Sequence, residues 1–222
     1  MEYHMTVKNA GLFFLVVLII ASCRKEEHDS FSVCNDLIFS GCDGSTQAAY
    51  CLFGLRWDKT NSGQIQTSDS LTLSYSFLDS GYMFNTHSQE NVTSLSFDQV
   101  IPCSKESVRK ALLEWASVAP LKFAETTNNE KADIRIAIAD ISQGGLGYPP
   151  FTNEPCKELA GLCVIRPIAN ATCDSYYCLA LHEIGHILGL GHILSNNVMN
   201  PNKCYKTLQQ GDIQGIQALY GK

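Results

Sequence analysis

The chain has 222 residues, 45% of them hydrophobic, and a formal net charge of −6 at neutral pH. This length suits one domain with a core of its own and leaves little room for two large domains. A nucleic-acid partner is excluded because phosphate neutralisation needs clustered lysine and arginine, which this acidic chain lacks.

The N-terminus is typical of an export signal. Residues 11–20 form an unbroken apolar run that is too short to span a bilayer, so we predict a signal peptide over residues 1–22. The alternative is an N-terminal core helix or a short anchor. The sequence IIASC resembles a bacterial lipobox, which predicts that Cys23 is lipidated and attaches the protein to a bacterial outer membrane or cell surface. Ordinary cleavage nearby would instead release a secreted protein.

Ten cysteines in an exported chain indicate disulfides formed in an oxidising compartment. If Cys23 carries a lipid, an odd number remains, so one thiol is free, lost on processing or used otherwise. Residues 24–53 are polar and show no sustained periodicity. We interpret residues 23–53 as a tether or a short propeptide-like segment, and residues 54–222 as the folded domain.

Short segments with a period of two predict the strands of this domain. Residues 71–77 and residues 132–140 alternate apolar side chains with polar or small ones. Residues 161–167 form a further strand candidate, and the glycine-rich residues 142–156 between these two strands are typical of a loop.

Two segments have helical spacing. Residues 104–118 predict a helix with Ser104 as its N-cap and with one apolar face formed by Val108, Leu112 and Trp115. A second helix is expected to begin near Asp174 or Ser175, either of which can cap it. This succession of strands and helices predicts an α+β (α/β-layered) fold on a small sheet.

The second helix carries the sequence HEIGHILGLGH. His182 and His186 are four residues apart, so both imidazoles lie on one face, where a single ion can bridge them. Glu183 is rotated by about 100° from that row. Two histidine ligands beside a carboxylate that need not coordinate are the arrangement of H-E-x-x-H zinc hydrolases.

The glycines indicate where a third ligand comes from. Gly189 lies where the helix has to stop, and glycine enters the left-handed region without penalty, so the chain can turn and bring His192 back to the ion. Three neutral imidazoles leave a fourth position open to water and favour zinc over magnesium. In a chain of this composition, the probability that the five fixed positions of HExxHxxGxxH occur by chance is on the order of 10⁻⁵. The alternative is an exposed histidine-rich helix.

HExxHxxGxxH followed by a methionine resembles the metzincin metalloproteases, and most closely the matrixins. The segments ALLEWASVAPLKFAE, ADIRIAIA and LQQGDIQGIQALYG also resemble matrixin segments, so the likeness covers residues 54–222. It implies a matrixin-like catalytic domain with a small twisted, mostly parallel sheet, a zinc-site helix and a C-terminal helix. It also implies that Met199 is a hydrophobic floor under the zinc rather than a ligand.

The chain departs from the family in its accessory sites. The regions that would supply histidines for a structural zinc read SQGGLGYPPF and GLCVIRP, so we expect one catalytic zinc and no second, structural zinc. The family's calcium would have to use Asp140 and backbone carbonyls near Gly144, Gly145 and Gly147.

The family's propeptide cysteine segment, PRCGxPD, is absent from residues 24–53. The nearest counterparts of its latency switch are Cys42 and Asp43, although an exported cysteine is more often in a disulfide.

The resemblance implies a zinc-dependent endopeptidase acting on extracellular proteins. Zinc bound by the three histidines would lower the pKa of a water molecule towards ~7 and polarise the scissile carbonyl, while Glu183 would take the proton and pass it to the leaving amine. The substrate is expected to lie extended along a sheet edge, which the resemblance places at residues 161–167. We expect a monomer.

Two other functions remain open from the sequence. One is a non-catalytic surface-binding lipoprotein on a degenerate protease fold, which the presence of all three ligands and the base disfavours. The other is a zinc amidase acting on cell-wall peptides, which shares the metal chemistry and differs only in its cleft. Cleavage preference depends on the loop after Met199, whose shape the sequence does not specify.

Overall fold

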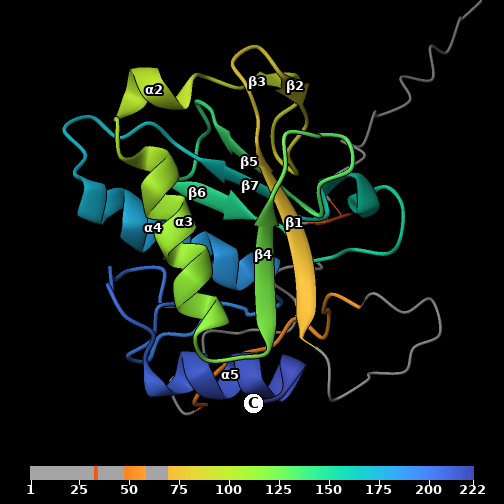
Figure 1. Ribbon diagram of the computed structural model, residues 1–222, viewed down its shortest axis with the longest axis vertical. Coiled ribbons are helices and arrows are strands. Elements are labelled where there is room, and N and C mark those ends of the chain that lie inside the picture. The colour runs from red at the N-terminus through yellow and green to blue at the C-terminus, as the bar shows by residue number, and fades with distance from the viewer. Residues whose placement is uncertain (1–32, 35–47, 59–69) are drawn as a thin grey trace, which may run out of the picture.

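The computed structural model describes residues 33–34, 48–58 and 70–222 (Figure 1). The predictions for the signal peptide, for Cys23 and for the latency candidates Cys42 and Asp43 lie outside these residues. Among the described helices, none combines the length and the apolar character that crossing a membrane requires.

A five-stranded sheet forms the centre of the domain (Figure 1). Its strand order is β4-β1-β5-β7-β6, in which the first three neighbouring pairs are parallel and β6 runs antiparallel to β7. This arrangement confirms the predicted small, mostly parallel sheet. Its strands are β1 (Leu71–Phe77), β4 (Leu121–Glu125), β5 (Ile134–Ile138), β6 (Gly145–Gly147) and β7 (Leu162–Ile165). A separate hairpin pairs β2 (Met83–Phe84) with β3 (Val92–Thr93).

The predicted position of the sheet edge is wrong. Residues 161–167 contain β7, which lies between β5 and β6 and is therefore an inner strand. The sheet edge next to β7 is formed by β6, where Gly145 pairs with Ile165 and Gly147 pairs with Cys163; the opposite edge is β4. The glycine-rich stretch that is typical of a loop in the sequence thus supplies the outermost strand beside β7.

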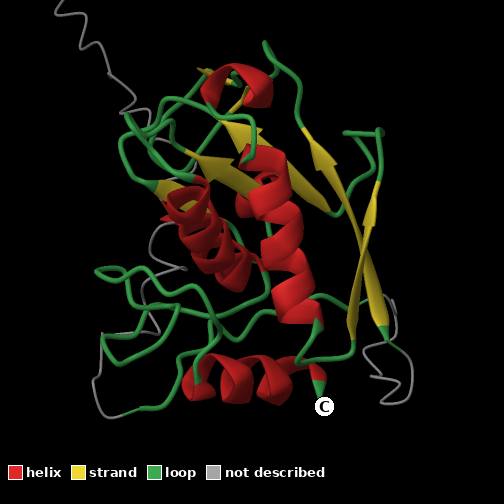
Figure 2. Cartoon of the chain, turned by 60° about the vertical axis from the view of Figure 1, so that its left-hand side comes forward, coloured by secondary structure: helices red, strands yellow, loops and turns green. Residues whose placement is uncertain are grey.

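Two long helices pack together on one face of this sheet (Figure 2). They are α3 (Ser104–Ala116) and α4 (Cys173–Ile187), and the indole Nε1–H of Trp115 donates a hydrogen bond of 3.0 Å to the Leu181 carbonyl of α4. The predicted apolar face of α3 is confirmed, because Val108, Leu112 and Trp115 are all buried. These side chains belong to one hydrophobic core cluster together with residues of α4 and the sheet.

The remaining helices are short or lie at the end of the domain. They are α2 (Phe97–Val100), the 3₁₀ helix η1 (Cys156–Leu159) and α5 (Gln210–Tyr220), and α5 lies below α3 and α4 in both views (Figures 1 and 2). Ile216 of α5 belongs to the same core as α3 and α4.

Both predicted helix caps are displaced. Cys103 is the N-cap of α3, and Ser104 is already helical, with its hydroxyl donating to the Phe97 carbonyl. Thr172 is the N-cap of α4, where its hydroxyl accepts from the Ser175 backbone N–H in a reciprocal capping box. The sequence does not distinguish Thr172 from Asp174 and Ser175, because all three are good capping residues.

Parts of the N-terminal segment lie against the domain. Leu52 forms a bridge with Leu190, the Phe53 backbone N–H donates to the Gly189 carbonyl at 2.9 Å, and a disulfide joins Cys34 to Cys156. The described residues before residue 54 are therefore attached covalently to η1 and by backbone pairing to the segment that follows α4.

Disulfides connect distant parts of the chain, as the cysteine content predicts. The described residues contain three complete bridges, Cys34–Cys156, Cys103–Cys173 and Cys178–Cys204. Cys51 is also disulfide-bonded, whereas the thiol of Cys163 is free and buried. These bridges indicate folding in an oxidising, extracellular-type compartment.

Replacing Gly189 by alanine is expected to lower the free energy of unfolding by about 3 kcal/mol. Gly189 has φ +106°, and a Cβ there would lie 2.2 Å from the Leu55 carbonyl oxygen. Urea unfolding measures the loss. Gly81→Ala is the matched control, since Gly81 has φ +87° with nothing within 4 Å. Equal losses in the two variants would show that the contact with Leu55 is unimportant.

Candidate active site

The structure brings the three predicted histidines together. His182 and His186 lie one turn apart on α4, the helix ends at Ile187, and the positive φ of Gly189 turns the chain so that His192 returns to the same point. Their Nε2 atoms are 3.1 Å apart between His182 and His186, 3.1 Å between His182 and His192, and 3.0 Å between His186 and His192. Among the described residues, these three side chains form the group of ligands that could hold a metal ion.

The hydrogen-bond partners of two of the imidazoles indicate that a cation fits between the rings. The Nδ1 atoms of His182 and His186 lie 2.7 Å and 2.8 Å from the carbonyl oxygens of Val198 and Leu190. A carbonyl only accepts, so each Nδ1 carries the proton and each neutral ring has a lone pair on Nε2. Two lone pairs 3.1 Å apart repel each other unless a cation lies between them. This donor set suits zinc.

Burial keeps the triad in its neutral, metal-binding form. It lowers the pKa of His182 and, together with the other two histidines, lowers that of His186 well below its ordinary value. Burial is also the main reason why the pKa of His192 falls to about 4. The imidazoles therefore need not lose a proton before they bind a cation near neutral pH.

Glu183 follows His182 on α4 and is 4% exposed. Burial raises its pKa to about 8, and a divalent cation on the neighbouring histidines would lower it again. Its side chain packs directly against β6, because a Cβ on Gly145 would lie 2.5 Å from Oε1 of Glu183. Only glycine at residue 145 leaves space for this carboxylate between the helix and the edge strand.

Met199 is buried beneath the histidine-bearing helix. A Cβ on Gly185, in the middle of α4, would lie 2.3 Å from its sulfur. The backbone around Met199 is fixed by a residue that the sequence did not single out, Asp212 of α5. The Asp212 carboxylate accepts from the backbone N–H groups of Val198, at 2.9 Å, and Met199, at 3.4 Å.

Asp212 connects the C-terminal helix to the histidine site. It also accepts from the Gln209 N–H at the start of α5, while the Val198 carbonyl accepts from His182. An aspartate in the first turn of a helix is a recognisable capping signal. Its second role depends on residues 13 and 14 positions earlier in the chain, which no local pattern indicates.

The histidines and Glu183 open into a cleft of about 630 Å³. One wall is residues 143–148, which include β6, and the other is formed by α4 and residues 200–204. His87 also lines this cleft, with its Nδ1 2.8 Å from the Tyr148 hydroxyl. Asp140, the predicted calcium ligand, is exposed and lies 3.7 Å from Arg166 Nε.

The mostly parallel sheet and the histidine triad resemble the arrangement expected of a matrixin-like catalytic domain. Residues 166–221, which contain the triad, Glu183 and Met199, match the family model described as Matrixin. Over these residues the chain is similar to the matrixin family of metalloproteases.

Curated relatives show the same likeness. The chain is 31% identical to Metalloendoproteinase 1 of Glycine max, over 53% of this chain and 45% of that protein. It is 30% identical to Metalloendoproteinase 4-MMP of Arabidopsis thaliana, over 60% and 44%, and 31% identical to Interstitial collagenase of Sus scrofa, over 62% and 32%. The chain therefore spans less than half the length of each of these relatives. They give no support to the predicted bacterial lipoprotein.

Proposed function

We propose that this chain is a zinc-dependent endopeptidase that hydrolyses internal peptide bonds of extracellular proteins. The observation that carries the proposal is the convergence of three neutral imidazoles, with Nε2 atoms 3.0 to 3.1 Å apart, beside the buried carboxylate of Glu183 in an open cleft. His182, His186 and His192 would hold one zinc ion, and Met199 would support the site from below.

Bound zinc would supply a Lewis acid that acidifies a water molecule and polarises the scissile carbonyl. Glu183 takes the proton of the attacking water and delivers it to the leaving amine, acting first as general base and then as general acid. Its confinement between α4 and Gly145 holds the carboxylate in one place for both transfers.

The substrate would bind in extended form along β6. This strand is at the edge of the five-stranded sheet and its residues line the cleft beside the triad. Strand addition uses the backbone of the edge strand, so Gly145 and Gly147 can serve it without side chains that project into the cleft.

We propose export of the protein, with Cys23 as the site of lipid attachment and residues 1–22 as its signal peptide. Support for export comes from the disulfides of the described domain. Support for lipidation comes from the IIASC sequence alone.

The purified domain is expected to cleave casein and gelatin at internal bonds and to lose this activity in the presence of a zinc chelator. Activity depends on the chelatable ion because no other side chain in the cleft replaces its Lewis acidity. Mass spectrometry of the digests, with peptidoglycan as a parallel substrate, is the measurement.

The results of these digestions distinguish the three candidate functions. Cleavage of peptidoglycan stem peptides without cleavage of proteins would identify an amidase. Absence of hydrolysis in a zinc-loaded sample would identify a binding module. Protein cleavage that persists in chelator would contradict the metal mechanism.

A further inference from the structure

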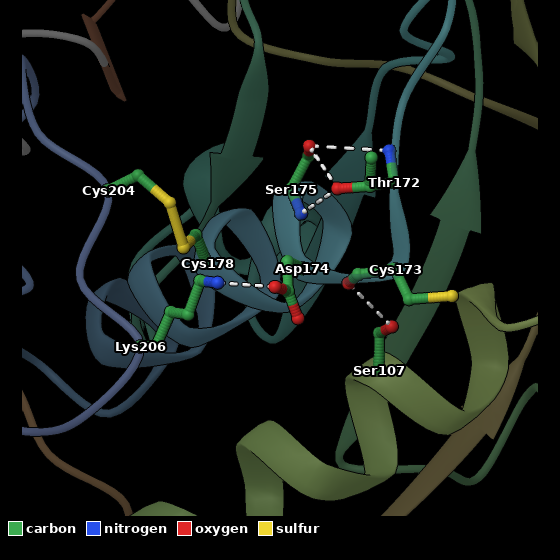
Figure 3. A network of polar contacts seen from close by, with 8 residues as sticks. All are labelled: Ser107, Thr172, Cys173, Asp174, Ser175, Cys178, Cys204 and Lys206. Atoms are coloured by element: carbon green, nitrogen blue, oxygen red, sulfur yellow. Dashed lines mark hydrogen bonds and ion pairs between the residues drawn. A yellow bond between two sulfur atoms is a disulfide. The ribbon is translucent and has the colours of Figure 1, made fainter.

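Three successive turns of α4 are tied to residues 198–206, the segment that contains Met199. Nearest the metal site, His182 donates to the Val198 carbonyl. One turn earlier, a disulfide joins Cys178 to Cys204, and one turn before that, Asp174 pairs with Lys206. Figure 3 shows the disulfide and the ion pair on the same side of α4. Residues 198–206 are thus held along the helix at three points.

The segment between these ties is a wall of the cleft. Residues 200–203, here called the wall loop, line the cleft together with both Cys178 and Cys204. The opposite wall is β6. Leu179 and Ile168 contribute apolar surface to the cleft. The disulfide therefore borders the space into which a substrate side chain beside the scissile bond would extend.

The two ends of the wall loop are held by different means. Before it, Val198 and Met199 are fixed by Asp212, independently of the disulfide. After it, Cys204 is exposed and its bond to the buried Cys178 is the covalent tie. The Asp174–Lys206 pair has side chains that are 62% and 58% exposed, so it adds little. The Lys203 Nζ and the Tyr205 hydroxyl also donate to Asn196 Oδ1, but both hydrogen bonds are exposed and neither reaches α4. Loss of the disulfide would therefore remove the covalent tie between α4 and the far end of the wall loop and leave the metal-site end in place.

We propose that the Cys178–Cys204 disulfide determines substrate specificity by holding the wall loop at a fixed distance from β6, so that the cleft accepts apolar side chains of limited size. This inference rests on the proposed peptidase function. Without the bond, the wall loop moves away from α4 and larger side chains enter. The metal site does not change, because its contacts to Val198 and Asp212 remain.

The test variant is the double substitution Cys178→Ala/Cys204→Ala. Both cysteines are replaced because a single substitution would leave a thiol one turn from His182 that could itself bind zinc. The matched control is Cys103→Ala/Cys173→Ala. It removes a disulfide from the first residue of the same helix, where Cys173 points away from the Cys178 side (Figure 3). Neither Cys103 nor Cys173 lines the cleft.

The first measurement is the cleavage of a peptide library by zinc-loaded proteins. We expect the wild type to discriminate by at least about 10-fold in kcat/KM between a medium apolar and a large aromatic side chain at one position. The Cys178→Ala/Cys204→Ala variant is expected to reduce this ratio to within about threefold, and the control to keep it. An unchanged ratio in a variant that cleaves the library would overturn the proposal.

The second measurement does not depend on activity. Hydrogen exchange of the metal-free proteins is expected to accelerate at residues 200–206 in the variant by at least about 10-fold and to remain unchanged at Val198 and Met199. Unchanged exchange at residues 200–206 would also overturn the proposal.

If the variant folds poorly, Cys178→Leu/Cys204→Ala restores the buried apolar volume without the bond and should show the same effects. A wild-type protein that cleaves no peptide would refute the peptidase function. The exchange result would still test whether the Cys178–Cys204 disulfide holds the wall loop.

Discussion

Replacing Glu183 by glutamine is expected to lower kcat/KM for peptide hydrolysis by about 10²- to 10⁴-fold while the bound zinc is retained. Glutamine has the shape of glutamate, so it fits the narrow space beside Gly145, but its amide cannot accept the proton of the attacking water. The zinc-binding imidazoles are unaffected, because Glu183 is not one of the three residues whose side chains could hold the metal ion.

The measurement is zinc content by elemental analysis together with kcat/KM on a quenched peptide. Glu158→Gln, which changes an exposed glutamate outside the cleft, is the control and should match the wild type. A Glu183→Gln protein with full zinc content and wild-type activity would remove Glu183 from the mechanism.

Replacing Asp212 by asparagine is expected to cost about 3 kcal/mol of unfolding free energy and to weaken zinc binding. The buried carboxylate accepts from three backbone N–H groups, those of Val198, Met199 and Gln209. An asparagine amide offers one oxygen and turns its NH₂ group towards a donor, which leaves at least one buried N–H group without an acceptor. Movement of Val198 would also release the carbonyl that orients His182.

Urea unfolding and competition with a chromophoric chelator measure the two effects, and zinc affinity is expected to fall by about 10- to 100-fold. Asp140→Asn is the control, because Asp140 is exposed and its substitution should change stability by no more than about 0.5 kcal/mol. Unaltered zinc affinity in a destabilised Asp212→Asn protein would show that Asp212 supports the fold without orienting the site.

The histidine site was predictable because its determinants are local. The spacing of His182 and His186 sets their common face on any helix, and Gly189 marks the end of that helix wherever it packs. The apolar face of α3 was predictable for the same reason. In each case the periodicity of one segment carries the information, and the structure shows the expected result.

The features that the sequence did not indicate depend on distant residues. The edge strand β6 has only three residues, two of them glycine, and pairs because β7 is beside it. The disulfides join cysteines 26 to 122 positions apart, so their pairing follows from the fold. Asp212 matters through the contacts it makes with the loop that carries Met199. Both walls of the cleft and the support of the site thus arise from tertiary contacts.

The most direct test of the central claim is a titration of the metal-free protein with zinc, followed by the rate of hydrolysis of an internal peptide bond. The triad predicts that activity rises linearly and stops rising at one equivalent of zinc per chain, since three imidazoles from one chain hold one ion. A rise that continues to two equivalents, or a protein that binds one zinc ion and hydrolyses no peptide, would contradict the account.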